Sequence, residues 1–416
     1  MSETIRLPGV GVPRALLANE TAFGGGVEGD LRCGTLVLRY GRAERLDAGA
    51  PGRPERLVLP RLTEAHVHLD KCHSFDRCAG VGGDLAVAIA AQARDKAHWT
   101  AEDLAHRAGR GLDELIAAGC GAVRSHVDWT TGRGHPEVPL AWEVLGELAA
   151  DAAERGVTLQ RAALTAIDEM ADHARAEAVA RRVARDDGVL GSFLLDQPDR
   201  REGLRVLFAM ADRFGLPVDF HVDEGLDPSL DGLELIADVA LETRFAGPVL
   251  CGHACSLASR GEGDVARIGD KLAAAGIAVA SLPTTNLYLQ GRRDGTPDRR
   301  GLTRLHELAA RGVAIVIGTD NVRDAFCPIG RHDPLHSLSL AVLAGHLDPP
   351  FGWQLPTITT DARRAMGLAP GYVDSARAED LLVFEVPSLS SLVAGAAQPF
   401  PLTRHPMAAR TGHTHA

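Results

Sequence analysis

Residues 57–71 read LVLPRLTEAHVHLDK, a short apolar run that leads into two histidines two positions apart. On a β-strand, side chains at positions i and i+2 lie on the same face, so the imidazoles of His66 and His68 would face one point. Histidine is the commonest metal ligand, and two of them at the end of a buried strand predict half of a metal site. An H-x-H pair also occurs by chance, so this interpretation depends on the rest of the chain.

Composition excludes several classes of protein. The 416-residue chain has a formal net charge of −11 and no basic cluster, which argues against nucleic acid or an anionic membrane surface as a partner. No segment approaches the roughly 18 apolar residues of a membrane span, and the N-terminus lacks the apolar core of a signal peptide. Seven scattered cysteines favour reduced thiols over a disulfide framework. We therefore expect a cytoplasmic protein.

A repeat of apolar runs and Ala-rich helical segments begins at Leu57. Seven further runs start just after glycines, at spacings of 27 to 36 residues, namely Gly121, Gly156, Gly188, Gly215, Gly247, Gly276 and Gly312. In the first repeat, Thr100 with Asp103 predicts a helix start, and Gly119 predicts its end. Eight such units predict a (β/α)8 TIM barrel, whose functional groups lie at the C-terminal ends of its strands. A doubly wound open sheet is the alternative, but no G-x-G-x-x-G follows an early strand.

Both ends of the chain show a different pattern. Residues 1–56 are Gly-rich with short β-like runs, including 34–40, and residues 379–385 read as one more exposed strand. We expect these segments to form a small β-sandwich domain built from both termini. The expected division is 1–56 for the N-terminal part of that domain, 57–352 for the barrel, and 353–416 for its C-terminal part and the tail.

Polar residues follow several of the predicted strands. They are His66 and His68 after the first, His126 and Asp128 after the second, His221 and Glu224 after the fifth, His253 after the sixth, and Asp320 after the eighth. An unpaired buried carboxylate is costly, so Asp320 needs a partner such as a divalent cation. The alternatives are a core role for His221, a helix N-cap for Asp320, and a thiolate site in which His253 joins Cys251 and Cys255. His126 and Asp128 could equally serve to support the site.

Together these residues resemble the amidohydrolase superfamily, in particular its cytosine deaminase-like branch. The matching motifs stand in the same order along the chain and cover nearly all of it: His66-x-His68-Leu-Asp-Lys71, His126-Val-Asp128, His221-Val-Asp-Glu224, His253 and Gly318-Thr-Asp320. The segment 286–330 is similar to the corresponding loops of cytosine deaminases and of related triazine and creatinine deaminases.

The resemblance implies one divalent metal ion held by His66, His68, His221 and Asp320. Binuclear relatives need a lysine at the end of strand 4 to carry a bridging carbamate, and no lysine exists here between Lys96 and Lys271. Three imidazoles and a carboxylate suit Zn²⁺ and Fe²⁺ alike, so the ligands do not choose between zinc and iron.

The same resemblance implies catalytic roles for Asp320, His253 and Glu224. A metal-bound water has its pKa lowered toward neutrality; Asp320 would take its proton, while His253 would hold the hydroxide and the developing oxyanion. Glu224 would protonate the ring nitrogen beside the attacked carbon and help ammonia leave. The implied enzyme is a hydrolytic deaminase that removes an exocyclic amino group from a small nitrogen heterocycle.

Two alternatives stay open. A cyclic amidase that opens its substrate's ring could use the same scaffold. A non-catalytic barrel could serve as an assembly module, although relatives of that kind lose metal ligands and all four are present here. The oligomeric state is also open, and a homo-oligomer is compatible with the sequence.

The substrate side departs from the cytosine deaminases. Their strand 3 ends in a glutamine that reads the pyrimidine edge, whereas Leu164 and Ala166 stand in this region here. The acidic residue that follows the strand 8 aspartate is replaced by Asn321, and a loop tryptophan is replaced by Phe326. We expect these four residues and Gln290 to bind the substrate, and we expect cytosine itself to be a poor substrate.

Overall fold

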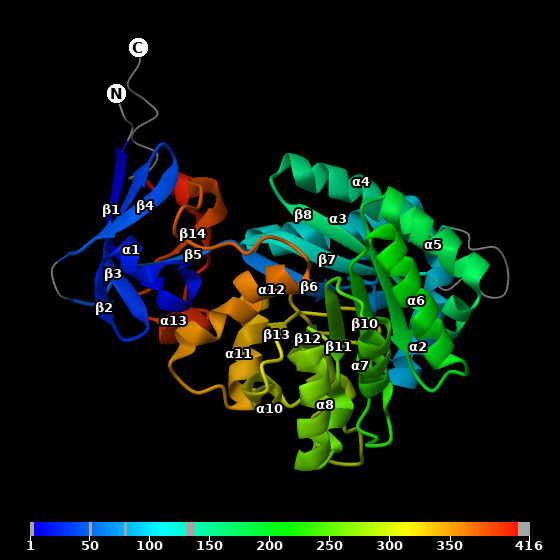
Figure 1. Cartoon of the computed structure of the whole chain (residues 1–416). Helices are drawn as coiled ribbons and strands as arrows, with labels where there is room; N and C mark the ends of the chain where they lie inside the picture. Colours follow the sequence, from blue (N-terminus) through cyan, green and yellow to red (C-terminus); the bar gives the residue numbers. More distant parts are fainter. Residues whose placement is uncertain (1–3, 50–51, 79–80, 130–137, 407–416) are drawn as a thin grey trace.

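A computed structural model describes residues 4–49, 52–78, 81–129 and 138–406, and these residues form two separate sheets (Figure 1). The larger sheet has eight parallel strands that are neighbours in chain order, with helices around them. Its strands are β6 Leu62–Val67, β7 Cys120–Asp128, β8 Thr158–Ala166, β9 Val189–Leu194, β10 Val218–Val222, β11 Val249–His253, β12 Ile277–Ser281 and β13 Ile315–Ile317. The predicted (β/α)8 barrel is confirmed.

Helices follow the barrel strands along the chain. They are α2 Leu85–Asp95, α3 Ala101–Ala117, α4 Leu140–Glu154, α5 His173–Arg185, α6 Arg200–Phe214, α7 Gly232–Thr243, α8 Glu262–Ala274, α9 Pro283–Leu289, α10 Leu305–Ala310, α11 Pro334–Gly345 and α12 Thr360–Ala365. Helix α3 starts where its sequence predicts, because the Thr100 side chain accepts a hydrogen bond from the Asp103 backbone N–H at 3.2 Å. None of the described helices combines the length and the apolarity needed to cross a membrane.

The second sheet joins the two ends of the chain. Its order is β15-β14-β5-β1-β3-β2, with β4 paired to β3, and Figure 1 shows its blue and red strands side by side, away from the barrel. Its strands are β1 Thr4–Pro13, β2 Gly26–Glu28, β3 Leu31–Arg39, β4 Arg42–Asp47, β5 Arg56–Pro60, β14 Leu381–Phe384 and β15 Phe400–Pro401. The short helix α1 Glu20–Phe23 packs against β4, and α13 Leu389–Val393 packs against α11. The predicted small β domain from both termini is confirmed.

The start of the barrel needs a correction. The apolar run at Leu57 belongs to β5, which pairs with β14 in the terminal sheet, and the first barrel strand starts at Leu62 rather than at Leu57. Two apolar strands separated only by Arg61 read as one run in the sequence. Arg61 separates the two strands, and its guanidinium donates to the backbone carbonyls of Gly156 and Cys120. We therefore propose Arg61 as the first domain boundary.

The C-terminal boundary also lies later than residue 353 in our proposal. Helix α12 packs against β6 and β13 at the barrel, and its residues Ala362 and Ala365 belong to the same buried cluster as Ala65 of β6. We place the second boundary after this helix. Of the expected tail, residues 404–416, the part from residue 407 onward lies outside the described residues.

A few hydrogen bonds close the barrel between its first strand, β6, and its last strand, β13. In the described part of the chain, β6 and β13 share no ladder; an isolated bridge joins Val67 to Asp320, and the Asp320 N–H donates to the His66 carbonyl at 2.9 Å. The buried Glu64 carboxylate adds to this seam, because it accepts the backbone N–H groups of His66 at 2.9 Å and of Thr319 at 3.1 Å. The hydrogen bonds that Glu64 accepts thus take the place of the missing ladder hydrogen bonds between β6 and β13.

We expect Glu64→Leu to lower the free energy of unfolding by at least ~2 kcal/mol, because two buried N–H groups lose their acceptor. Thr63→Val is the matched control, since the buried Thr63 hydroxyl has no hydrogen-bond partner among the described residues. Urea unfolding of both variants checks this expectation. Equal stability of the two variants would contradict the role given to Glu64.

Candidate active site

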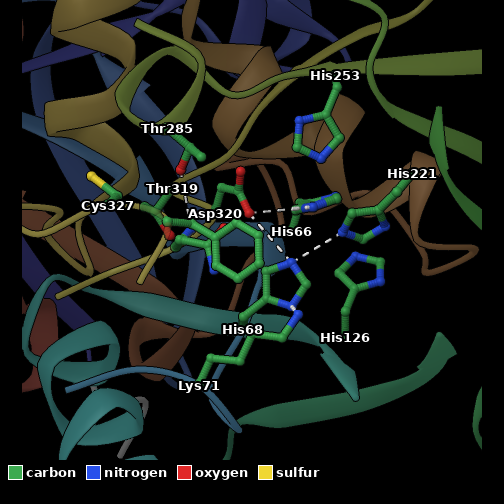
Figure 2. A network of polar contacts seen from close by, with 12 residues as sticks. His66, His68, Lys71, His126, His221, His253, Thr285, Thr319, Asp320 and Cys327 are labelled. Atoms are coloured by element: carbon green, nitrogen blue, oxygen red, sulfur yellow. Dashed lines mark hydrogen bonds and ion pairs between the residues drawn. The ribbon is translucent and has the colours of Figure 1, made fainter. Parts of the chain in front are cut away.

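The four predicted metal ligands meet at the C-terminal end of the barrel (Figure 2). His66 lies in β6 and His68 just beyond it, His221 lies in β10, and Asp320 follows β13. His68 Nε2 lies 3.0 Å from His221 Nε2 and 3.4 Å from Asp320 Oδ1, while His66 Nε2 lies 3.7 Å from the same oxygen. The structure therefore brings together side chains that are far apart in the sequence.

The buried polar atoms of this group fit a cation. Both ring nitrogens of His66, both carboxylate oxygens of Asp320 and Nδ1 of His221 have no hydrogen-bond partner among the described residues. Such atoms are costly inside a protein unless something compensates them. Burial, together with the neighbouring imidazoles, lowers the pKa of His66 and of His221 well below the usual value. The rings are therefore neutral near pH 7, the form in which an imidazole binds a metal.

Two glycines make room for the His66 side chain. A Cβ at Gly252 of β11 would lie 2.7 Å from His66 Cε1, and a Cβ at Gly318 would lie 3.2 Å from His66 Cβ and 3.1 Å from Glu64 Oε1. Real Cβ contacts are longer than the first of these distances. Any larger residue at position 252 would displace this ligand.

His126 lies directly beside the ligands. Its ring centroid is 4.1 Å from that of His66, and its Nε2 is 3.8 Å from Asp219 Oδ1 in β10. The Asp219 carboxylate in turn accepts a hydrogen bond from Arg124 Nη1 at 2.7 Å. Sequence reasoning missed Asp219, although its position two residues before His221 puts it on the same strand face. His66, His126 and Asp219 form a further group that could share a cation.

Asp128 connects two lysines to the site. Its carboxylate pairs with Lys71 Nζ at 2.8 Å and with Lys96 Nζ at 2.5 Å. Lys71 Nζ also lies 3.2 Å from His68 Nδ1. The sequence left the role of Asp128 open. Its ion pairs with the two lysines place it in the wall of the site.

Glu224 and His253 lie next to the ligands, with His253 Nε2 at 3.6 Å from Glu224 Oε2. The other His253 nitrogen, Nδ1, lies 3.1 Å from the Asn286 amide oxygen, which can only accept, so Nδ1 carries a proton and donates it to Asn286. Burial raises the pKa of Glu224 above its usual value. Gln290 donates to the backbone carbonyl of Glu224 at 3.3 Å.

A cavity of about 300 Å³ opens above these residues, with three of the five predicted substrate residues in its wall: Leu164, Asn321 and Phe326. Ala166 and Gln290 do not line it. The other wall residues, which no sequence pattern predicted, come mainly from α2 and from the end of β9. These are Leu85, Ile89, Gln92, Ala93, Lys96, Phe193, Leu194 and Leu195.

The fold and this set of side chains are those of an amidohydrolase. The chain belongs to the amidohydrolase family, whose sequence pattern matches residues 89–372. This confirms the predicted resemblance, and the chain is a hydrolase of that family. It is 35% identical over 339 residues to a pterin deaminase of Rhizobium rhizogenes (strain K84 / ATCC BAA-868), a match that covers 81% of this chain and 75% of that protein.

Two solved structures show the same architecture. The 5-methylcytosine deaminase from Klebsiella pneumoniae, liganded with 5-fluorocytosine, superimposes with a TM-score of 0.78 at 26% identity and covers 96% of both chains. N-isopropylammelide isopropylaminohydrolase from Burkholderia multivorans ATCC 17616 gives a TM-score of 0.70 at 20% identity and covers 96% of this chain and 97% of that one. The second likeness concerns the fold alone.

Proposed function

We propose that the protein is a metal-dependent hydrolytic deaminase that removes an exocyclic amino group from a small nitrogen heterocycle and releases ammonia. The observation that carries this proposal is the convergence of His66, His68, His221 and Asp320 at one end of a largely apolar cavity, with Glu224 and His253 beside them. The names of the similar pterin and 5-methylcytosine deaminases support the same reaction class.

In this proposal one divalent ion, zinc or iron, is held by the three histidines and Asp320. A bound divalent metal supplies a water whose pKa is lowered toward neutrality. The Asp320 carboxylate has no other hydrogen bond among the described residues, so it is available to take a proton from the attacking water. Three imidazole nitrogens and one carboxylate suit both zinc and iron as ligands.

Glu224 and His253 act on the substrate in this proposal. Burial raises the pKa of Glu224, which favours its protonated form, and this carboxyl delivers a proton to the ring nitrogen beside the attacked carbon. Glu224 then receives the proton that Asp320 took from the water and passes it to the leaving amine, and it recovers its own proton from the hydroxyl group added to the ring carbon. Asn286 accepts a hydrogen bond from Nδ1 of His253, whose Nε2 faces the reacting centre and orients the attacking oxygen.

The substrate lies against Leu164, Asn321 and Phe326 in this proposal, with Ala166 and Gln290 supporting the wall from outside the cavity. Asn321 Nδ2 donates to Asp324 at 2.6 Å, so its amide oxygen is the group left to accept from the substrate. Cytosine deaminases carry an acidic residue there. We also propose a cytoplasmic location, where the seven free cysteines would stay reduced.

A screen for ammonia release tests the reaction class. We expect ammonia from at least one of pterin, isocytosine, creatinine or an aminotriazine, and a kcat/KM for cytosine below ~10⁵ M⁻¹s⁻¹, because the missing edge contacts leave buried polar groups unpaired. Ring opening without ammonia would favour a cyclic amidase instead. A kcat/KM for cytosine above this value would show that the substitutions at residues 164, 166 and 321 do not govern specificity.

We expect one tightly bound divalent ion per chain. Elemental analysis of protein purified without added metal, before and after dialysis, measures it. His66→Ala should lose the ion, whereas the exposed His106→Ala should retain it. Two equivalents that both survive dialysis would contradict the mononuclear site.

We expect Glu224→Gln to keep the metal and the fold but to lower kcat by at least ~10²-fold, the usual contribution of a general acid–base group. The exposed Glu262→Gln on α8 is the control for loss of one carboxylate. Steady-state kinetics with the best substrate from the screen provide the measurement. Near-normal turnover of Glu224→Gln would place the proton transfer elsewhere.

A further inference from the structure

One face of helix α2 forms a wall of the cavity. Leu85, Ile89, Gln92 and Lys96 all line it, and their spacings of four, three and four residues put them on one side of the helix and its continuation. Ile89 is 45% exposed although it is apolar. This wall therefore offers an apolar surface with two polar groups at its end.

Gln92 presents a hydrogen-bond acceptor without a partner. The residue is 2% exposed, and its Nε2 lies 3.5 Å from Asp95 Oδ2. Trp99 Nε1 donates to the same oxygen at 2.8 Å, and Arg77 also holds this carboxylate. An ionised carboxylate only accepts hydrogen bonds, so the amide nitrogen must face Asp95. The buried Oε1 has no partner among the described residues, and a ligand N–H would satisfy it.

The Lys96 side chain offers hydrogen-bond donors to a ligand in the cavity. Its ammonium group has three N–H donors, and Asp128 Oδ2 takes one of them at 2.5 Å. The other oxygen of Asp128 pairs with Lys71, so one carboxylate serves two cations. The Lys96 side chain is 33% exposed, against 6% for Lys71, so Lys96 is the more accessible of the two. The remaining acidic side chain of the cavity wall, Glu224, lies against His253.

We propose that the substrate is a heterocycle with a carboxylate substituent that binds Lys96 and a ring N–H that donates to Gln92. The inference rests on the proposed function and names the substrate class of that site. A carboxylate would form charge-assisted hydrogen bonds with Lys96, and the substituted ring would cover Leu85 and Ile89. A small ring such as cytosine has no carboxylate for Lys96, which is a further reason for it to bind poorly.

The test compares pterin with pterin-6-carboxylate in the full-length holoenzyme. Binding is followed by the fluorescence of the pterin, which needs no turnover, and kcat/KM is followed by ammonia release. We expect the wild type to prefer the carboxylate by at least about tenfold, in the range for a hydrogen bond between charged groups. Lys96→Met should weaken binding of the carboxylate at least about tenfold more than binding of pterin.

Lys271→Met is the matched control. This lysine lies on α8, where it pairs with Glu234 and Asp238 outside the cavity, so its loss removes the same charge without touching the substrate. Both ligands should bind this variant as they bind the wild type. Gln92→Leu should raise KM about tenfold for both pterins, because each carries the ring N–H.

The outcomes test the carboxylate inference separately from the proposed deaminase function. Equal binding of both pterins to the wild type, no binding of either, or an equal loss for both ligands in Lys96→Met would overturn the carboxylate inference. An unchanged KM in Gln92→Leu would overturn the role of Gln92. Tight, Lys96-dependent binding of pterin-6-carboxylate without ammonia release would leave the recognition intact and reject the deaminase function.

Discussion

The buried carboxylate of Glu64 connects the closure of the barrel to the geometry of the site. It accepts one backbone N–H on each side of the seam, from His66 in β6 and from Thr319 beyond β13. These residues are a proposed metal ligand and the neighbour of another, Asp320. The first and last strands are therefore held in register at the point where their ligand side chains must converge, and the small contact between β6 and β13 suffices to close the sheet.

The backbone of the site is also strained in places. Asp320 and His253 have φ angles of +59° and +72°, in the left-handed region that residues other than glycine rarely adopt. Such conformations cost on the order of 1–3 kcal/mol each and persist where the surroundings hold them. Here the Asp320 N–H is bound to the His66 carbonyl, and the His253 ring is bound to Asn286. In this conformation the His253 side chain lines the cavity, and the Asp320 carboxylate lies against His66 and His68.

The sequence predicts much of this arrangement because a parallel barrel places all strand ends at one rim. A histidine or an aspartate that follows an apolar run, such as His221 or Asp320, can thus be assigned to the site without knowledge of its contacts. Other features depend on contacts that no local pattern records. Arg61 separates two apolar strands that read as one, and the wall from α2 lies in a long connection after the first strand. Only packing brings Gln92 and Lys96 to the cavity.

The seam between β6 and β13 has a thermodynamic consequence. His66 and His68 lie on one side of it and Asp320 on the other, so a cation shared by them binds the closed barrel in preference to any state in which the strands have parted. Under such linkage each tenfold rise in free metal above the dissociation constant adds ~1.4 kcal/mol to the stability of the folded chain. With the proposed metal site occupied, the persistence of the fold would depend on the supply of metal around it, as well as on its sequence.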